Sequence, residues 1–247
     1  MRARRPRRAR AALAAAAVLL AAAATATALH SSMLNGRRHG VAVPPAASRP
    51  VRSPAHAPPR APAAAVDAAG LRWASFHGMR LPVSPADGPR RIRGGLAAGF
   101  TDTPTGALLA AVNIAVRTAF LWGPAIFEPT ISRQVTGPGA AALLRGQAGA
   151  YQQLRAAAHV PAGQPIGRGY ATEAAYRLIR YNPASAAFDV VTAGPGPNGI
   201  TVLTATRIAV IWRGGDWRVV APPGGDWQTA AVTISSLSGY TTFPGQG

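Results

Sequence analysis

The chain has 247 residues with 26 arginines, no lysine and no cysteine, against 8 acidic residues, so its formal charge is +18. The absence of cysteine excludes disulfides, thiolate nucleophiles, cysteine-ligated zinc and iron–sulfur clusters. The absence of lysine excludes a Walker-type nucleotide site and Schiff-base chemistry.

Residues 1–10 form a basic tail with six arginines, and residues 11–29 follow as 19 uncharged, alanine-rich positions. A helix of that length spans roughly 28 Å, close to the ~30 Å hydrocarbon core of a bilayer. Because the flanking arginines lie only on the N-terminal side, the pattern predicts a signal-anchor helix with a cytoplasmic N-terminus and an extracytoplasmic remainder. A signal peptide cleaved after Ala28 is the alternative, since Ala26-Thr27-Ala28 fits a small-x-small cleavage site.

Residues 30–70 are expected to be a disordered linker rich in proline, alanine and arginine. Seven prolines occur in the nineteen residues 44–62, which favours an extended spacer that carries a domain away from the membrane. Plain disorder without a spacing role is the other interpretation. In both cases the segment contributes no hydrophobic core.

Residues 71–232 have the composition and periodicity of a folded domain, and residues 233–247 are expected to be a C-terminal tail. The first clear helix starts in the sequence TDTPTGALLAAVNI, where Thr103 can cap and Pro104 suits the first helical position. Its apolar face has helical spacing and consists of Leu108, Ala111, Val112, Ala115 and Ala119. A shorter segment at 125–134 and a third helix at 138–158 are predicted to follow.

Strands dominate the second half of the domain and are predicted at 172–181, 186–193, 200–212 and 217–221. Gly214-Gly215 fits a two-residue hairpin turn. That turn would set Trp212 opposite Trp217 and Arg213 opposite Asp216, as an aromatic pair and an opposite-charge pair. Simple alternation also puts Tyr176 and Tyr181 on opposite faces of their strand.

Helices followed by antiparallel strands predict an α+β fold. The specific expectation is a cystatin-like or nuclear-transport-factor-like cone, in which a curved antiparallel sheet of about four strands wraps around the helix that begins at Pro104. One transmembrane helix would precede this domain.

The domain contains few residues suited to catalysis. His77 and His159, with Asp102, Glu173 and Asp189, are its general acid and base candidates, and no HExxH or GxSxG motif occurs. We therefore predict no catalytic, cofactor-binding or metal-binding residues. Gly194, Gly196 and Gly199 match GxGxxG, but a strand pattern follows them instead of a helix, which indicates a hairpin loop.

Two further sets of residues suggest binding surfaces. Most of the aromatic residues are expected in the core, although some could mark a ligand cavity or partner surface: Trp73, Phe76, Trp122, Phe127, Tyr151, Tyr170, Tyr176 and Tyr181. Five arginines on adjacent strands could form a basic patch, with a solvated sheet face as the ordinary interpretation: Arg177, Arg180, Arg207, Arg213 and Arg218. Such a patch would suit an anionic envelope polymer, nucleic acid in transit or an acidic protein.

Residues 73–243 resemble a family of membrane-anchored actinobacterial proteins of uncharacterised function that are often encoded on integrative or conjugative elements. The resemblance rests on WASFHGMRLPVS with Gly88-Pro89, GFTDTPTGALLAAVNI, SRQVTGPG and ISSLSGYTTFPG. Relatives tend to have histidine before Thr-Pro, where this chain has Asp102, and no site residues are carried over. The layout of anchor, linker and exported domain is also similar, at the level of architecture, to the periplasmic scaffold subunit of type IV secretion machines.

The sequence therefore predicts a non-enzymatic, single-pass membrane protein that acts as a scaffold or accessory component of a conjugation-type transfer apparatus. Its expected partners are the membrane and other envelope proteins of a transfer complex, with self-association as a further expectation and no direct nucleic-acid site. The alternative is a secreted or anchored domain that binds a small ligand in the cone pocket. An isomerase- or hydratase-type enzyme on the same fold ranks third.

Overall fold

The computed structural model describes residues 65–245, so the predicted basic tail, the predicted anchor and most of the predicted linker lie outside the described residues. Three α-helices occur in the described chain: α1 (Pro104–Arg117), α2 (Pro124–Gln134) and α3 (Ala140–Ala157). The strands are β1 (Arg72–Phe76), β2 (Met79–Val83), β3 (Arg91–Arg93), β4 (Leu96–Ala98), β5 (Val135–Thr136), β6 (Thr172–Asn182), β7 (Ser185–Pro195), β8 (Thr201–Arg213), β9 (Asp216–Val220), β10 (Ala231–Ile234) and β11 (Thr241–Thr242). No helix in residues 65–245 is long and apolar enough to cross a membrane.

Seven strands form the main sheet, in the order β11-β6-β7-β8-β9-β5, with β10 also paired to β8. All neighbours are antiparallel except β5 and β9, which are parallel. Two further hairpins, β1–β2 and β3–β4, form separate two-stranded sheets.

The expected cone, with a curved sheet of about four strands around one helix, is therefore wrong. The observed main sheet is mixed and has seven strands, and two small sheets accompany it. Most of the missed strands are short, and a strand of two to five residues carries too little alternation to stand out in a sequence. Three of them, β5, β10 and β11, pair with strands that are distant in the chain, whereas β1–β2 and β3–β4 are local hairpins.

Three hydrogen bonds and a proline determine where α1 begins. The Thr103 hydroxyl accepts a hydrogen bond from the Gly106 amide at 3.0 Å, and Pro104 occupies the first turn, as predicted. The Asp87 carboxylate accepts hydrogen bonds from the hydroxyls of Thr101 and Thr103 at 2.7 and 2.6 Å. These bonds fix the cap, and with it the direction in which the helix enters the core.

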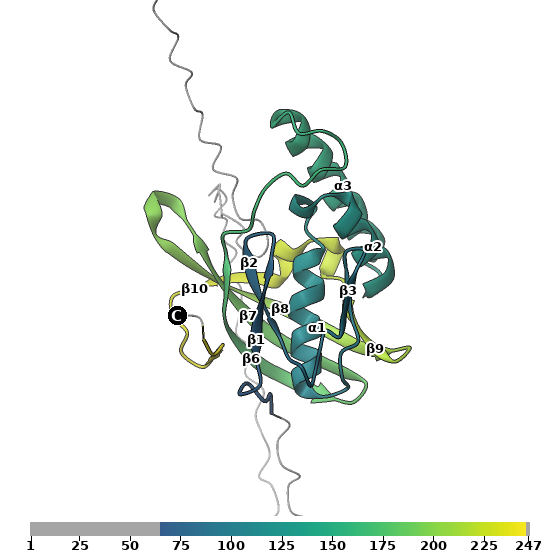
Figure 1. Ribbon diagram of the computed structural model, residues 1–247. Coiled ribbons are helices and arrows are strands. Elements are labelled where there is room, and N and C mark those ends of the chain that lie inside the picture. Colours follow the sequence, from purple (N-terminus) through teal and green to yellow (C-terminus); the bar gives the residue numbers. More distant parts are fainter. Residues whose placement is uncertain (1–64, 246–247) are drawn as a thin grey trace, which may run out of the picture. The chain divides into compact units, whose positions relative to one another are not determined.

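Helix α1 is buried on every side from Thr105 to Arg117. It packs on the main sheet through β7, β8 and β9, and it is flanked by β2, β4 and α2. Figure 1 shows α1 running across the sheet, with the β1–β2 hairpin on one side and α2 and α3 on the other. The predicted apolar stripe is therefore only part of its buried surface. The remaining buried residues include Gly106, Ala107 and Ala110, whose small size lets neighbouring elements approach closely.

The β8–β9 hairpin has the predicted register, with Trp212 opposite Trp217 and Arg213 opposite Asp216. The two indole rings meet edge to face with centroids 5.2 Å apart. The predicted Arg213–Asp216 charge pair is wrong, because the Asp216 carboxylate accepts hydrogen bonds from the amides of Gly99 and Phe100 at 2.8 and 3.2 Å. Asp216 thus joins the hairpin to the segment before α1.

Tyr176 and Tyr181 lie on the same face of β6, which contradicts the prediction from simple alternation. The register of β6 against β7 shifts at Ile179, so Tyr176 pairs with Val190 and Tyr181 with Ala186. Both tyrosines pack against the core. One extra residue in a strand reverses the orientation of every side chain beyond it.

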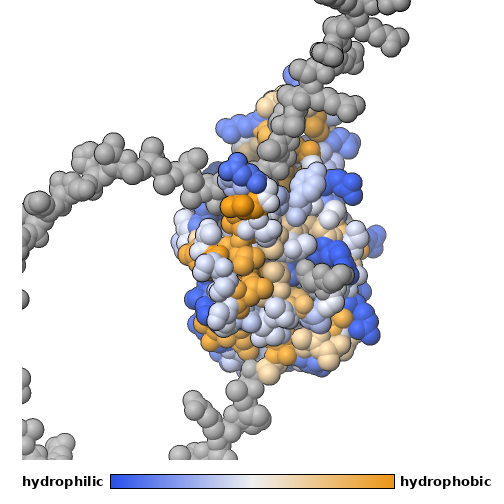
Figure 2. All heavy atoms as spheres, turned by 90° about the vertical axis from the view of Figure 1, so that its left-hand side faces the viewer, coloured by the Kyte–Doolittle hydropathy of each residue, from blue (hydrophilic) through white to orange (hydrophobic). Residues whose placement is uncertain are grey.

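The segment expected as a C-terminal tail takes part in the sheet. It completes β10 and supplies β11, which pairs with β6. Phe243 is buried, and its ring lies 4.9 Å from that of Tyr176 and 5.8 Å from that of Trp73. Figure 2 shows the side of the domain on which this segment lies, where apolar side chains form an elongated stripe bordered by polar ones.

Candidate functional site

The five arginines singled out in the sequence lie on one face of the main sheet. Arg177, Asp189 and Arg207 are direct neighbours across β6, β7 and β8, and cross-strand neighbours point to the same side of a sheet. The shift at Ile179 keeps Arg180 on this side, and the pairings of β8 with β9 add Arg213 and Arg218. We call this surface the arginine face, and define it by Arg177, Arg180, Arg207, Arg213 and Arg218.

Asp189 binds two of these arginines. Its carboxylate accepts a hydrogen bond from Arg177 at 2.7 Å and two from Arg207. Burial by itself raises the pKa of Asp189, but the hydrogen bonds from Arg207 and Arg177 outweigh that effect and hold the pKa below its usual value. The Arg177 guanidinium also lies over the Tyr240 ring, 4.6 Å from its centroid. This end of the arginine face is therefore partly neutralised and covered.

Arg180, Arg213 and Arg218 form no ion pair within residues 65–245, where the ion pairs involve Asp189 alone. The nearest carboxylate to Arg213 along the hairpin is Asp216, whose oxygens bind backbone amides instead. A buried carboxylate that already accepts three amide hydrogen bonds has little capacity left for a guanidinium. The far end of the arginine face thus keeps its positive charge.

A fourth cation, Arg133 in the last turn of α2, extends this charged end. Arg133, Val135, Thr136, Arg213, Gly214 and Arg218 line a surface basin of about 370 Å³. The basin exists because β5 follows α2 directly and pairs in parallel with β9, Val135 opposite Val219. No acidic residue lines it.

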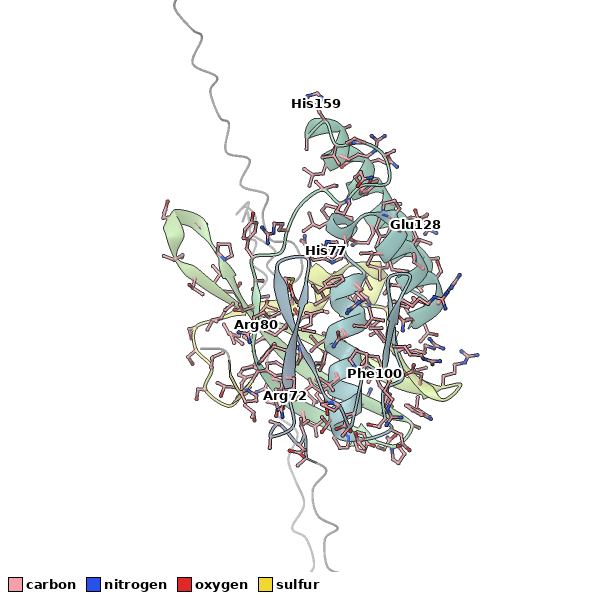
Figure 3. The ribbon with its side chains drawn as sticks, viewed as in Figure 1. Arg72, His77, Arg80, Phe100, Glu128 and His159 are labelled. Carbon is pink, nitrogen blue, oxygen red and sulfur yellow. The ribbon has the colours of Figure 1, made fainter. Side chains whose placement is uncertain are left out.

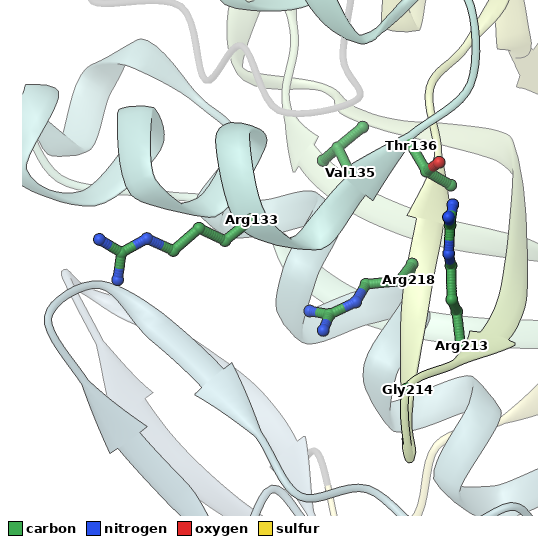
Figure 4. Close-up of a pocket in the computed structure, with 6 residues that line it drawn as sticks. All are labelled: Arg133, Val135, Thr136, Arg213, Gly214 and Arg218. Carbon is green, nitrogen blue, oxygen red and sulfur yellow. The ribbon is translucent and has the colours of Figure 1, made fainter.

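Figure 4 shows that the three guanidinium groups of this basin do not converge on one point. Arg213 lies along β9 with its guanidinium close to Thr136. Arg218 extends away from Arg213, and Arg133 reaches away beyond α2. A site for one small phosphate would need donors that converge on a single anion. The observed arrangement instead suits several negative groups spread along a surface.

An apolar groove of about 740 Å³ adjoins this basin. Its lining includes Pro138, Gly139 and Ala142 before and within α3, Arg207 and Ala209 of β8, Val220 of β9, the loop Ala221, Pro222, Pro223 and Gly224, and Thr229 and Ala230. Val220 is two residues from Arg218 on β9, and Pro138 is two residues from Thr136. The groove and the basin therefore form one continuous surface, apolar at one end and basic at the other.

The general acid and base candidates are dispersed through the domain. Glu173 pairs with Thr192 on the face of the sheet that packs against α1, whereas Asp189 lies on the arginine face. His159 is exposed just beyond the end of α3, far from His77 at the β1–β2 turn (Figure 3). Asp102 precedes α1, and about 20 Å of helix separates it from the end of α1 near His77.

His77 lies in an aromatic environment beside the last turn of α1. Its ring is 4.7 Å from that of Phe76 and 5.2 Å from that of Trp122. Burial, together with the charge of Arg117, lowers its pKa. The Arg117 guanidinium itself lies over the Phe76 ring at 4.4 Å and donates to the backbone and side-chain oxygens of Asn113. This cluster joins the β1–β2 hairpin to α1.

Glu173 is the most strongly perturbed acid in the described chain. It is fully buried, and burial raises its pKa to about 8. The carboxyl group is therefore mostly protonated at neutral pH. No group of three or more histidine, aspartate or glutamate side chains within residues 65–245 could hold a metal ion.

The glycine-rich motif and most of the aromatic residues singled out in the sequence belong to a loop or to the core. The GPGPNG segment connects β7 to β8, so its interpretation as a hairpin loop is confirmed. Trp122, Phe127, Tyr151 and Tyr176 are buried, and Tyr170 is 63 % exposed. Sequence reasoning missed Arg133, Thr136 and the groove, because the β5–β9 pairing that assembles them joins residues more than 80 positions apart.

A comparison with protein families matches residues 33–242 to a domain of unknown function, DUF8175. The chain belongs to this family. No curated protein and no solved structure matches the chain. Because the DUF8175 family carries no assigned activity, the function of this member must be argued from its own surface.

Proposed function

We propose that this DUF8175 protein is a non-enzymatic, single-pass envelope protein whose domain binds an acidic partner protein through the arginine face. In this proposal residues 11–29 anchor the chain with its N-terminus in the cytoplasm, and the domain acts outside the membrane. The protein would serve as a scaffold or accessory component of a conjugation-type transfer apparatus, in keeping with the resemblance of its sequence motifs.

One observation carries the binding proposal: five arginines from three strands share one face of the sheet, and within residues 65–245 only the Asp189 carboxylate forms ion pairs with them. Residues 65–247 contain 15 arginines and 8 acids, so the domain is basic overall and this face concentrates the excess. A surface of this kind attracts and orients an acidic partner before contact.

The apolar groove favours a protein over an anionic polymer. A polyanion would use the guanidinium groups but would gain nothing from proline and alanine side chains. Protein interfaces, in contrast, combine arginine with an apolar centre. The separation of the guanidinium groups in the basin also suits carboxylates spread along a protein surface.

The dispersed acid and base candidates support binding rather than catalysis. General acid–base catalysis requires side chains within hydrogen-bond reach of one reacting group. Glu173 and Asp189 lie on opposite faces of a sheet, and His159 is at the exposed end of α3.

A photo-cross-linking residue placed at Arg180 of the full-length chain, in cells of the source organism, tests the binding proposal. We expect a cross-link to one envelope protein with an acidic surface, and its loss when Arg213 and Arg218 are both changed to glutamate. The same residue at His159, which is exposed away from the arginine face, is the matched control. Equal cross-linking at both positions would contradict the proposal.

Membrane fractionation followed by intact-mass measurement tests the anchor. An unprocessed N-terminus in the membrane fraction is the expected result. A mature protein that begins at Leu29 and is found in the culture fluid would overturn the scaffold role while leaving the arginine face as a binding surface.

A further inference from the structure

The pairing of β8 leaves a gap along one of its edges. On that side β10 pairs with Leu203, Ala205 and neighbouring residues up to Thr206, and β9 pairs from Val210 onward. Within the described chain, the three residues 207–209 therefore have no strand beside them on this side. They span about 10 Å, and the segment that contacts β8 just before β10 is the 3-10 helix η4 (Trp227–Ala230) rather than a strand. An unpaired strand edge presents amide and carbonyl groups to an incoming chain.

The apolar groove lies along this gap, since Arg207 and Ala209 both line it. Its opposite wall is tightly packed against α3. The loop Pro222–Gly225 packs so closely on α3 that a Cβ atom on Gly225 would lie 2.3 Å from the Leu143 amide nitrogen, and Gly225 has a φ of +75°. The Ala221 amide also donates to the Thr136 carbonyl at 2.8 Å. A preformed wall of this kind costs little ordering entropy when a ligand binds.

Charge identifies the kind of occupant. No acidic residue lines the groove or the basin, and Arg207, Arg213, Arg218 and Arg133 border them. The N-terminal segment of this chain is a poor occupant, because residues 1–64 contain 11 arginines and no acid. A second copy of the chain is similarly disfavoured by its own excess of positive charge.

We propose that an extended segment of the acidic partner docks in this groove beside residues 207–209 of β8, with apolar side chains against Pro138, Ala142 and Pro222 and carboxylates reaching Arg218 and Arg213. This proposal rests on the proposed function and specifies how the partner is held. It combines addition of a short extended segment to a sheet edge with charge recognition at one end. Arg218 of the basin and Val220 of the groove are two positions apart on β9, a distance of about 7 Å. Apolar and acidic residues should therefore be close together in the docked segment.

The test is a selection of random 12-residue peptides on the purified full-length chain, followed by binding measurements on the enriched peptides. We expect enriched peptides with aspartate or glutamate next to apolar residues. Ala142→Trp should fill the groove and weaken their binding by about tenfold or more, a loss of about 1.4 kcal/mol. Ala141→Trp is the matched control, because Ala141 is the adjacent residue of α3 and is exposed. It should leave binding within about twofold of the wild type.

Three results would overturn the proposal: no acidic and apolar consensus, equal binding by Ala142→Trp and wild type, or full competition by polyphosphate and single-stranded DNA. The last result would identify a polyanion site. The cross-link from Arg180 distinguishes failure of the groove proposal from failure of the proposed function. If the cross-link survives in Ala142→Trp, the arginine face binds a partner but the groove does not. If the cross-link is absent from wild type as well, the proposed function itself fails.

Discussion

Glu173 and Asp189 are carboxylates on adjacent strands of one sheet, yet their surroundings shift their pKa values in opposite directions. Glu173 is buried on the face that packs against α1, where desolvation raises its pKa to about 8. Asp189 is on the arginine face, where Arg207 and Arg177 hold its pKa below the usual value despite partial burial. Alternate residues of the same strands thus build a dry, packed face and a charged, accessible one. The first face stabilises the domain, and the second is free to bind.

The largest effect is expected on the packed face, at Trp217. Its side chain is fully buried, meets Trp212 edge to face and donates to the Thr101 carbonyl at 2.7 Å. Trp217→Ala should lower the free energy of unfolding by about 3–5 kcal/mol, measured by urea denaturation. Trp217→Phe, which keeps a ring but loses the hydrogen bond, should cost less. Equal losses in the two variants would show that packing contributes little at this position.

Gly106 tests how tightly α1 approaches its neighbours. A Cβ atom there would lie 2.2 Å from the Thr101 carbonyl oxygen, so Gly106→Ala should cost about 1–3 kcal/mol. Gly146→Ala is the matched control in α3, because a Cβ atom at Gly146 meets nothing within 4 Å. It should gain about 0.5–1 kcal/mol from helix propensity. Thermal melts of both variants check the opposite signs, and destabilisation by both would contradict this account.

Ionisation of Glu173 should make the domain less stable as pH rises. Because its pKa is 4.5 in the unfolded chain and about 8 in the folded one, its stabilising contribution is complete below pH 4.5 and is lost as pH rises through 8. The slope between these values is up to about 1.4 kcal/mol per pH unit. Urea midpoints from pH 5 to pH 9 should fall less steeply in Glu173→Gln than in wild type. Parallel curves would exclude Glu173 as the source of the slope.

Asp189 should contribute a pH dependence of stability that is opposite in sign to that of Glu173 and smaller, which Asp189→Asn tests. The carboxylate contributes stability above its unfolded pKa, and this is lost as pH falls through the lower folded value. Its arginine partners are 46 % and 53 % exposed, so the loss at pH 7 should be below about 1 kcal/mol. The variant should also bind the acidic peptides more tightly, because Arg177 and Arg207 then lose the carboxylate that neutralises them. Weaker binding would assign Asp189 an organising role in the site.

Arg180→Gln should produce the smallest change in stability, within about 0.5 kcal/mol. Arg180 is exposed and forms no ion pair in the described chain. The same variant should weaken acidic-peptide binding and reduce its salt dependence. A variant that loses stability but keeps its binding would reverse the roles assigned to the two faces.

Some elements of this domain follow from adjacent residues. Thr103 and Pro104 determine where α1 begins, because a cap and a first-turn proline act within one turn of helix. Gly214-Gly215 similarly determines the β8–β9 register and the contact between Trp212 and Trp217. Alternation and the hairpin register also place Arg207, Arg213 and Arg218 on one face, whereas Arg180 joins Arg177 on that face only through the register shift at Ile179. These features depend on interactions over a few positions of the chain.

Other features depend on residues that are distant in the sequence. The short strands β5, β10 and β11 exist as strands because the sheet gives them a partner, and Asp216 binds the amides of Gly99 and Phe100 only after the hairpin packs on that segment. The shift at Ile179 likewise decides which side chains of β6 face outward. The sequence by itself determined the basic character of this protein and its principal helices and strands. Only the tertiary structure decided the seven-stranded sheet, the basin with Arg133 and the groove beside β8, because each joins residues whose contact depends on the packing of the whole domain.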